Sequence, residues 1–205
     1  MTEERKLNRE YFLWKRLREG DTKALFSLYD QFFDTLFNYG LHFSRNKELI
    51  KDCIHDLFLD LYKYRKNLSE TDNVRYYLLR SLRRLIYKEN TRKISVLPDD
   101  QILLQNDIPE MAFEDNLIVS EIKDENHRVL AECMKELSDK QREGLALKFE
   151  QNLSYKEISG ILGISVESAR TSVYRALKDL RKALRKKGFP IQLLFFFFRN
   201  RQHIF

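Results

Sequence analysis

The sequence predicts an all-α protein of two small helical domains joined by an acidic linker, the second domain being a helix-turn-helix. Apolar residues recur at three- and four-residue spacing along most of the 205 residues, and only three prolines interrupt this pattern. No stretch has the alternation typical of a strand. An acidic segment containing Pro98 and Pro109 separates the two helical parts.

The first domain, residues 1–93, is expected to contain four helices. The first spans Tyr11 to Leu17, and Asp21 can cap the second, whose wide aromatic stripe ends at Tyr39. A third helix is expected over 47–64 and a fourth over 74–90, separated by a polar break. The inward positions of these two helices are Ile50, Ile54, Leu57, Phe58 and Leu61, then Tyr77, Leu78, Leu82, Leu85 and Ile86.

The linker, residues 94–126, carries most of its charge between Asp99 and Glu125, where Lys123 is the only basic residue. Its prolines oppose continuous helix, so it is expected to be partly extended before helix resumes over 117–137. An acidic connector is also expected to avoid DNA.

The second domain, residues 127–188, contains two capping boxes. Ser138 with Gln141 predicts a helix that continues to about Glu150, and Ser154 with Glu157 predicts the next. The second of these helices has Ile158, Ile161 and Leu162 as its expected buried stripe. In this domain the residues next to the start of each short helix are therefore enough to predict where that helix begins.

Gly163 can take the left-handed conformation that ends a helix, and Ser165 can cap the following one. One face of this last helix is apolar, through Ala169, Val173, Ala176, Leu177, Leu180 and Leu184. The opposite face carries Ser168, Arg170, Thr171, Ser172, Arg175 and Lys178. The pattern predicts a helix-turn-helix whose second helix enters the major groove, where arginine can bind guanine by two hydrogen bonds. The alternative is the solvated face of an ordinary helical hairpin.

Charge distribution agrees with nucleic-acid binding. The net charge is +6, and basic residues are concentrated over 65–93 and 170–187. Cys53 and Cys133 lie in helical patterns and are expected to be buried in a reducing, cytoplasmic setting. We predict no signal peptide, membrane span, metal site or cofactor. The four histidines are scattered without a nucleophile or phosphate loop, so an enzyme has little support.

Four segments in order resemble a bacterial RNA polymerase sigma factor of the extracytoplasmic-function class of the sigma-70 family, in the style of Bacteroidetes members. The resemblance covers about residues 10 to 187. The segments are Asp52–Tyr62, Asn73–Arg83, Leu137–Phe149 and Leu153–Leu184. The first domain would then be like sigma region 2, and the second like sigma region 4.

The resemblance implies that the third helix docks on the coiled coil of the polymerase β′ subunit. The residues implied in polymerase binding are Asp52, His55, Asp56, Phe58 and Asp60. An acidic face suits a basic partner, although a merely solvated face has the same composition. Core RNA polymerase, through its β′ and β subunits, is thus an expected partner.

The loop over 68–73 matches the segment that captures a base flipped from the −10 element. Asp72 and Asn73 could hydrogen-bond that base, and Tyr76 or Tyr77 could stack on it. The residues implied in −10 binding are Leu68, Asp72, Asn73, Arg75, Tyr76, Arg80, Arg83, Arg84 and Lys88. Core packing is the alternative role for the tyrosines, and we expect Tyr77 to be buried and Tyr76 to lie nearer the surface.

The helix-turn-helix matches the part of the family that binds the −35 element. The residues implied there are Ser165, Glu167, Ser168, Arg170, Thr171, Ser172, Arg175 and Lys178. The acidic linker resembles the segment that threads the active-centre cleft of polymerase, and it could also be a disordered tether.

Some residues depart from the family pattern. His55 replaces a common Gln, Arg84 a common Asn, Lys88 a common Asp, and Ser172 a common Arg. The apolar tail, residues 189–205, has no counterpart, and it either folds back on a domain or docks on a partner.

The resemblance implies a sigma factor that binds core polymerase, recognises −35 and −10 promoter elements and promotes DNA opening. Its expected partners include promoter DNA, both duplex and melted, and an anti-sigma factor or another recruiting protein. The alternative is a helix-turn-helix transcriptional regulator that acts without being a polymerase subunit, which would be expected to dimerise on palindromic sites.

Overall fold

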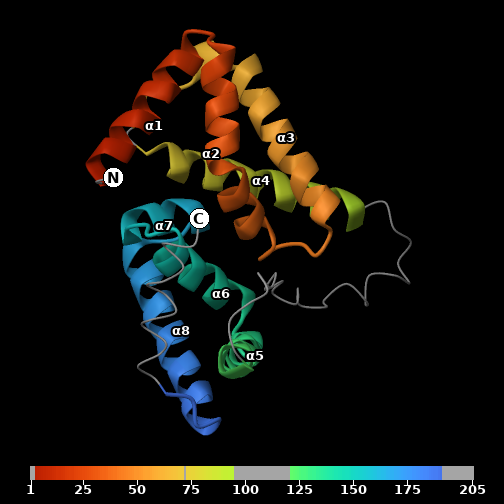
Figure 1. Cartoon of the computed structure of the whole chain (residues 1–205), viewed down its shortest axis with the longest axis vertical. Coiled ribbons are helices and arrows are strands. Elements are labelled where there is room, and N and C mark those ends of the chain that lie inside the picture. The colour runs from red at the N-terminus through yellow and green to blue at the C-terminus, as the bar shows by residue number, and fades with distance from the viewer. Residues whose placement is uncertain (1–2, 72, 95–120, 191–205) are drawn as a thin grey trace. The chain divides into compact units, whose positions relative to one another are not determined.

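The computed structural model describes residues 3–71, 73–94 and 121–190, and it divides into two compact units, Met1–Glu110 and Met111–Phe205 (Figure 1). Every regular element in the described ranges is helical, as the sequence predicts. None of these helices combines the length and the apolar composition needed to cross a membrane. Asp72, most of the predicted linker and the tail from residue 191 lie outside the described residues.

The described part of the first unit contains four α-helices and a short 3-10 turn. They are α1 (Glu3–Arg18), α2 (Thr22–Gly40), α3 (Lys47–Lys63), η1 (Arg65–Asn67) and α4 (Val74–Ile94). Asp21 caps α2 as predicted, because its carboxylate accepts a hydrogen bond from the N–H of Lys23 at 2.8 Å. Helix α1 begins earlier and α4 ends later than the sequence pattern indicated.

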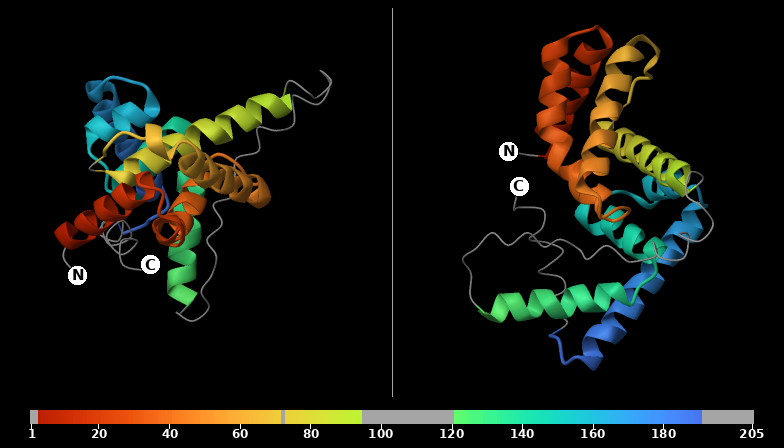
Figure 2. Two further views of the ribbon diagram at one scale, coloured as in Figure 1. Left: turned by 90° about the horizontal axis from the view of Figure 1, so that it is seen from above. Right: turned by 90° about the vertical axis from the view of Figure 1, so that its right-hand side faces the viewer.

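Large aromatic side chains fill the core of the first unit. Helices α2 and α3 lie side by side and α4 crosses both (Figures 1 and 2). Trp14, Phe32 and Tyr39 are almost completely buried. The indole N–H of Trp14 donates to the carbonyl of Ser69 at 3.0 Å, so α1 holds the loop that precedes α4.

The second unit is built around its last helix, on which the others pack. Its elements are α5 (Glu121–Lys135), α6 (Asp139–Leu145), η3 (Ala146–Glu150), α7 (Tyr155–Leu162) and α8 (Val166–Lys186). Both predicted capping boxes are confirmed. Alanines and aliphatic residues on α8 supply much of the core.

The helix predicted to continue to Glu150 changes its hydrogen bonding at Ala146, where a five-residue π-helix begins. The N–H of Gln151 donates to the carbonyl of Ala146, five residues back, at 3.0 Å. Residues 142–147 are all buried, so this segment is enclosed on every side. A surface pattern with a period of 3.6 residues does not reveal such a change.

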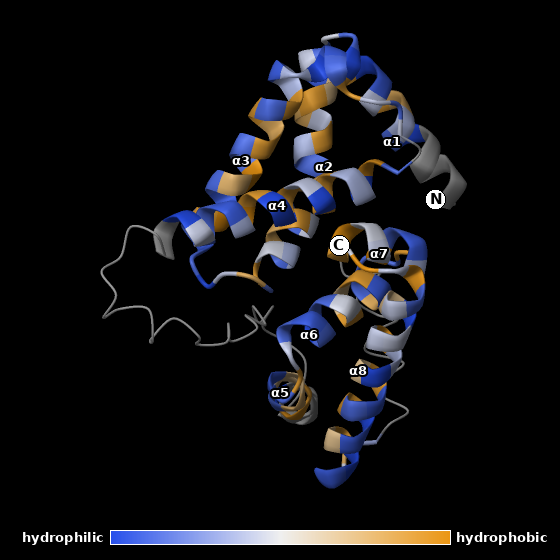
Figure 3. Ribbon diagram, turned by 180° about the vertical axis from the view of Figure 1, so that it is seen from behind, coloured by the Kyte–Doolittle hydropathy of each residue, from blue (hydrophilic) through white to orange (hydrophobic). Residues whose placement is uncertain are grey.

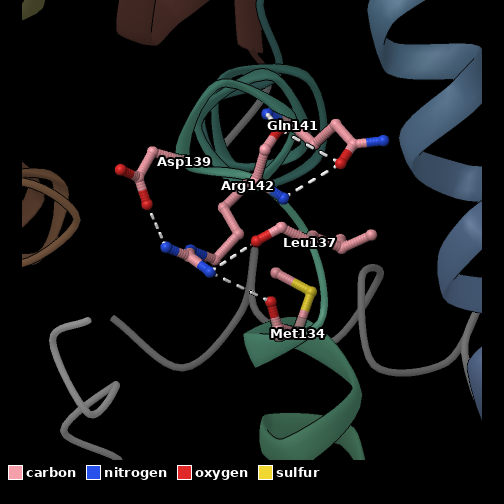
Figure 4. Close-up of polar contacts among 6 residues, drawn as sticks. Met134, Leu137, Asp139, Gln141 and Arg142 are labelled. Atoms are coloured by element: carbon pink, nitrogen blue, oxygen red, sulfur yellow. Dashed lines mark hydrogen bonds and ion pairs between the residues drawn. The ribbon is translucent and has the colours of Figure 1, made fainter. Parts of the chain in front are cut away.

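A buried arginine joins α5 to α6 (Figure 4). The guanidinium of Arg142, which is 6% exposed, donates to the carbonyl of Leu137 at 2.7 Å and to that of Met134 at 3.4 Å, and it pairs with Asp139. Carbonyl groups at the end of a helix have no partner within that helix. Arg142 therefore satisfies carbonyl groups where α5 ends.

Phe189, the first residue of the predicted tail, is buried in the core of the second unit. Its N–H donates to the carbonyl of Leu184 at 3.0 Å. At this residue the chain folds back on the domain, which was one of the two alternatives. The rest of the apolar run lies outside the described residues.

Candidate nucleic-acid interface

The turn between α7 and α8 has the geometry that the sequence predicts. Gly163 has φ of 69°, in the left-handed region, and its N–H donates to the carbonyl of Ser159 at 2.9 Å. Ser165 then caps α8 by accepting a hydrogen bond from the N–H of Ser168 at 3.1 Å. The end of α7 is therefore fixed by the backbone of Gly163 and the start of α8 by the side chain of Ser165, which together set the path of the chain into α8.

The buried face of α8 is confirmed for Ala169, Val173, Ala176, Leu180 and Leu184. Two residues of the predicted stripes are corrected: Leu177 on α8 and Leu162 on α7 are only half-buried. Leu177 lies about 100° around the helix from Ala176, at the rim of the buried stripe. Leu162 is the last residue of α7, and Ser159 is buried in that helix instead.

The outer face of α8 presents most of the predicted −35 residues to solvent. Those exposed are Ser165, Glu167, Ser168, Arg170, Arg175 and Lys178, while Thr171 and Ser172 are half-buried. Spacings of four and seven residues place Glu167, Thr171 and Lys178 on one stripe. Arg170 and Ser172 lie at opposite edges of this stripe.

Tyr174 is a residue that the sequence interpretation missed. It is 67% exposed and lies three residues after Thr171 on the outer face. An aromatic residue at an outward position of an amphipathic helix was the signal that could have identified it. The outer face thus combines hydroxyl groups, cations and one exposed ring.

Helix α4 carries a second basic face. Tyr76, Arg80, Arg83, Arg84 and Lys88 follow one another at spacings that place them on one side of the helix. The guanidinium of Arg80 donates to the hydroxyl of Tyr76 at 3.3 Å. The structure therefore brings together five of the residues implied in −10 binding.

Tyr87 lies on the same face of α4 and was also missed. It is 47% exposed, and the guanidinium carbon of Arg83 is 4.6 Å from the centre of its ring. Its ring is also 5.7 Å from that of Phe43, which contacts the buried Tyr39 at 5.0 Å. A run of aromatic rings thus leads from the core to this surface.

Two residues of α4 differ from expectation. Arg75 does not join the basic face, because positions four and seven residues later, Leu79 and Leu82, are buried. Tyr77 is half-buried rather than buried, which corrects its prediction as a core residue, while Tyr76 is also half-buried. Its ring packs at 5.0 Å from that of Trp14, at the edge of the core.

In the loop before α4, one residue is buried in the core and another caps the helix. Leu68 is buried, with 8% exposure, which corrects its prediction as a surface contact for DNA. The amide oxygen of Asn73 accepts a hydrogen bond from the N–H of Tyr76 at 2.9 Å, and thereby caps α4. Any contact of Asn73 with a base stays a prediction, and Asp72 lies outside the described residues.

The acidic face of α3 points to solvent, and Figure 3 shows alternating hydrophilic and hydrophobic bands along this helix. Asp52, His55, Asp56 and Asp60 are all exposed. Phe58 is 3% exposed and packs edge-on against Tyr29 at 5.0 Å, one turn after the buried Ile54, which confirms its predicted inward position and corrects its place among the residues implied in polymerase binding. The exposed apolar residue is Leu59, at 54%, which the sequence interpretation missed although it lies three residues after Asp56.

Two further features of the second unit, a buried thiol and an ion pair, shift the pKa values of their groups. Cys53 and Cys133 are buried as predicted, and burial raises the pKa of the Cys133 thiol. Lys187 at the end of α8 pairs with Glu132 of α5, and the hydrogen bond between them lowers the pKa of Glu132 and raises that of Lys187. No group of His, Cys, Asp and Glu able to hold a metal ion occurs among the described residues.

Comparisons with known proteins give a consistent result. Residues 127–180 match the family described as sigma-70, region 4. The chain is 31% identical over 159 residues to the RNA polymerase sigma factor SigZ of Bacillus subtilis strain 168, covering 77% of this chain and 85% of SigZ. It is 28% identical over 165 residues to the ECF RNA polymerase sigma factor SigM of the same organism, covering 78% of this chain and 94% of SigM.

A solved structure shares the fold. The sigma factor RpoE from Bartonella quintana, crystallised with the anti-sigma factor NepR, matches with a TM-score of 0.62 at 18% identity. The match covers 80% of this chain and 98% of that one.

Proposed function

Because this chain belongs to the RNA polymerase sigma factors, we propose that it is a promoter-recognition subunit. It binds core polymerase, recognises −35 and −10 promoter elements and promotes DNA opening. The capped helix-turn-helix of α7 and α8 carries this proposal, because its exposed polar and basic face suits the major groove. All of α7 and α8 up to residue 180 lie within the residues that match sigma-70 region 4.

The two basic faces divide the work. The outer face of α8 binds the −35 duplex through Ser168, Thr171 and Arg175, with Tyr174 beside them. The face of α4 follows the melted −10 strand through Tyr76, Arg80, Arg83, Arg84 and Lys88. We keep residues 1–93 and 127–188 as the two functional domains, with 94–126 as their linker.

The exposed face of α3 is the proposed contact with core polymerase. It contains Asp52, His55, Asp56, Leu59 and Asp60, so that one apolar side chain lies among carboxylates. A basic partner surface with an apolar contact would complement it. We assign the protein to the cytoplasm, with no catalysis of its own and with an anti-sigma factor or a recruiting protein as its controlling partner.

In vitro transcription tests this function. The purified chain is mixed with core polymerase and a library of genomic fragments, and the transcription start sites are mapped. We expect starts that share two upstream elements and that depend on both components. Specific DNA binding without any core-dependent transcription would instead indicate a regulator that is not a polymerase subunit.

Arg175→Ala connects this result to the −35 contact. Loss of a bidentate base contact should cost about 1–3 kcal/mol and relax preference at one position. Lys140→Ala, which removes an equal charge from an exposed position on α6, is the matched control. Unchanged promoter choice by Arg175→Ala would remove this residue from the site.

A further inference from the structure

Three elements of the second unit converge on the ring of Tyr155, the first residue of α7. The ammonium nitrogen of Lys148, from η3, lies 5.0 Å from the ring centre. The guanidinium carbon of Arg170, from α8, lies 5.6 Å from the same centre. The half-buried ring packs against the core of the unit, so both cations are gathered on a fixed support.

The π-helix and the turn that follows it bring Lys148 to the ring of Tyr155. After the wide turn at Gln151, Asn152 adopts φ of 53°, a left-handed conformation that asparagine tolerates. The chain then reverses into α7, and the N–H of Leu153 donates to the carbonyl of Leu147 at 3.1 Å. The ammonium of Lys148 donates to the carbonyl of Leu153 at 3.1 Å, which holds it beside the start of α7.

Arg170 lies at the edge of the outer face of α8, where its guanidinium is near this ring. Its guanidinium is also 3.4 Å from the carboxylate of Glu167. Stacking uses the flat face of a guanidinium and leaves the N–H groups in its plane able to donate. The side chain of Arg170 remains 59% exposed, so a phosphate can approach it.

We propose that Lys148 and Arg170 clamp the phosphate backbone of the −35 duplex through one phosphate contact each, and that Tyr155 is the residue that positions them. This inference rests on the proposed function and refines it, since it makes Arg170 a register-setting contact and not a base contact. Contacts to phosphate fix how a protein lies on DNA but carry no sequence information themselves.

The test uses holoenzyme reconstituted from core polymerase and the full chain. Binding is measured over a salt series to a promoter duplex from the mapped start sites, and to the same duplex with its −35 element scrambled. We expect Arg170→Ala and Lys148→Ala each to weaken binding by the same factor on both duplexes. Each should reduce the slope of log K against log salt by about 1, because one phosphate contact is lost.

Tyr155 is tested by its two substitutions. Tyr155→Phe keeps the ring and should retain the wild-type salt slope, whereas Tyr155→Leu should reduce the slope as the cation variants do. If Tyr155→Leu does not fold, as judged by circular dichroism, Lys148→Ala still decides whether this cluster contacts phosphate.

Other outcomes would overturn the clamp. Relaxed preference at a single −35 position with an unchanged salt slope would make Arg170 a base contact. A wild-type slope in folded Tyr155→Leu would remove its positioning role. If wild-type holoenzyme failed to prefer the promoter over the scrambled duplex, the proposed function itself would fail, which is a separate result.

Discussion

Helices α4 and α8 are both 21 residues long and both expose a basic face, but the two faces are built differently. On α4 two tyrosines lie among the cations, and the guanidinium of Arg83 lies over the ring of Tyr87. On α8 small hydroxyl side chains lie around Thr171, and the capped helix α7 with its glycine turn sets the direction of α8. Rings accept any unpaired base by stacking, whereas a narrow polar helix fits base edges in a groove. This difference supports the proposal that α4 contacts melted DNA and α8 contacts duplex DNA.

The supports behind these faces also differ. The loop before α4 is held by Trp14, within a core of large aromatic residues. Helix α8 packs through alanines and aliphatic residues, and Arg142 closes the end of the neighbouring α5. A substitution in the core behind one face should therefore destabilise the unit that carries this face and leave the stability of the other unit unchanged.

The largest expected effect is that of Trp14→Ala. The substitution removes a fully buried ring and its hydrogen bond to Ser69, and it should destabilise the first unit by about 3–5 kcal/mol. Urea unfolding followed by far-ultraviolet circular dichroism should show the transition of this unit at lower urea. The transition of the second unit should stay in place.

Phe26→Ala is the matched control, because Phe26 is also an aromatic residue of the first unit but is 65% exposed. Its unfolding should differ little from that of the wild type. An equal shift of both transitions in Trp14→Ala would show that the two units do not unfold separately, and the comparison of their supports would then fail.

Arg142→Leu applies the same test to the second unit. The carbonyls of Leu137 and Met134 lose a buried donor, which should cost about 1–3 kcal/mol. The second transition in urea should move and the first should not. Lys140→Leu changes an exposed cation on the same helix and serves as control. A stability unchanged by Arg142→Leu would mean that apolar packing replaces the cap.

Tyr87→Ala and Tyr174→Ala sharpen the contrast between the two nucleic-acid faces. Loss of one base–ring stack, the contact proposed for Tyr87, costs about 1–3 kcal/mol, whereas Tyr174 lies on the face proposed to bind duplex DNA. Tyr87→Ala should weaken holoenzyme binding to a promoter with a pre-melted −10 region more than to a duplex carrying only the −35 element. Tyr174→Ala should show the reverse preference. Equal losses on both templates would contradict the division of work between α4 and α8.

Much of this arrangement could be predicted because its signals are local. A hydroxyl or carboxylate at a helix start, as at Ser154 and Asp21, and a glycine at a helix end act over a few residues. Phe58 and Leu59 show the limit of the resemblance. The helical pattern placed Phe58 in the core correctly, but the residues implied in polymerase binding included Phe58 and left out the exposed Leu59 beside it.

The π-helix and the cluster around Tyr155 could not be predicted in this way. Lys148, Tyr155 and Arg170 belong to three elements, and their meeting depends on how η3 ends. Helical periodicity describes which side of one helix is apolar, but it does not describe contacts between helices. Tyr77 was misplaced for the same reason, because its exposure depends on Trp14 of another helix.

The smallest expected effect concerns the ion pair of Lys187 with Glu132, which ties the end of α8 to α5. The hydrogen bond from Lys187 lowers the pKa of Glu132 below its ordinary value of 4.5, so the stabilisation is present above that value and is lost as pH falls through the lower, folded value. The hydrogen bond to Glu132 raises the pKa of Lys187 above 10.5, so the stabilisation is present below that value and is lost as pH rises through the higher one. The full contribution is therefore expected from about pH 5 to about pH 10.

Lys187→Gln should lower the urea midpoint of the second unit slightly within this window, because both partners are accessible to solvent. Below the folded pKa of Glu132 the variant and the wild type should converge. Lys140→Gln, at an exposed lysine of α6, should show no such convergence. The stack of Arg83 on Tyr87 should not respond to acid in the same way, because arginine keeps its charge throughout this range. A difference between Lys187→Gln and wild type that persisted at the lowest pH would assign the effect of Lys187 to packing of its aliphatic chain and not to its charge.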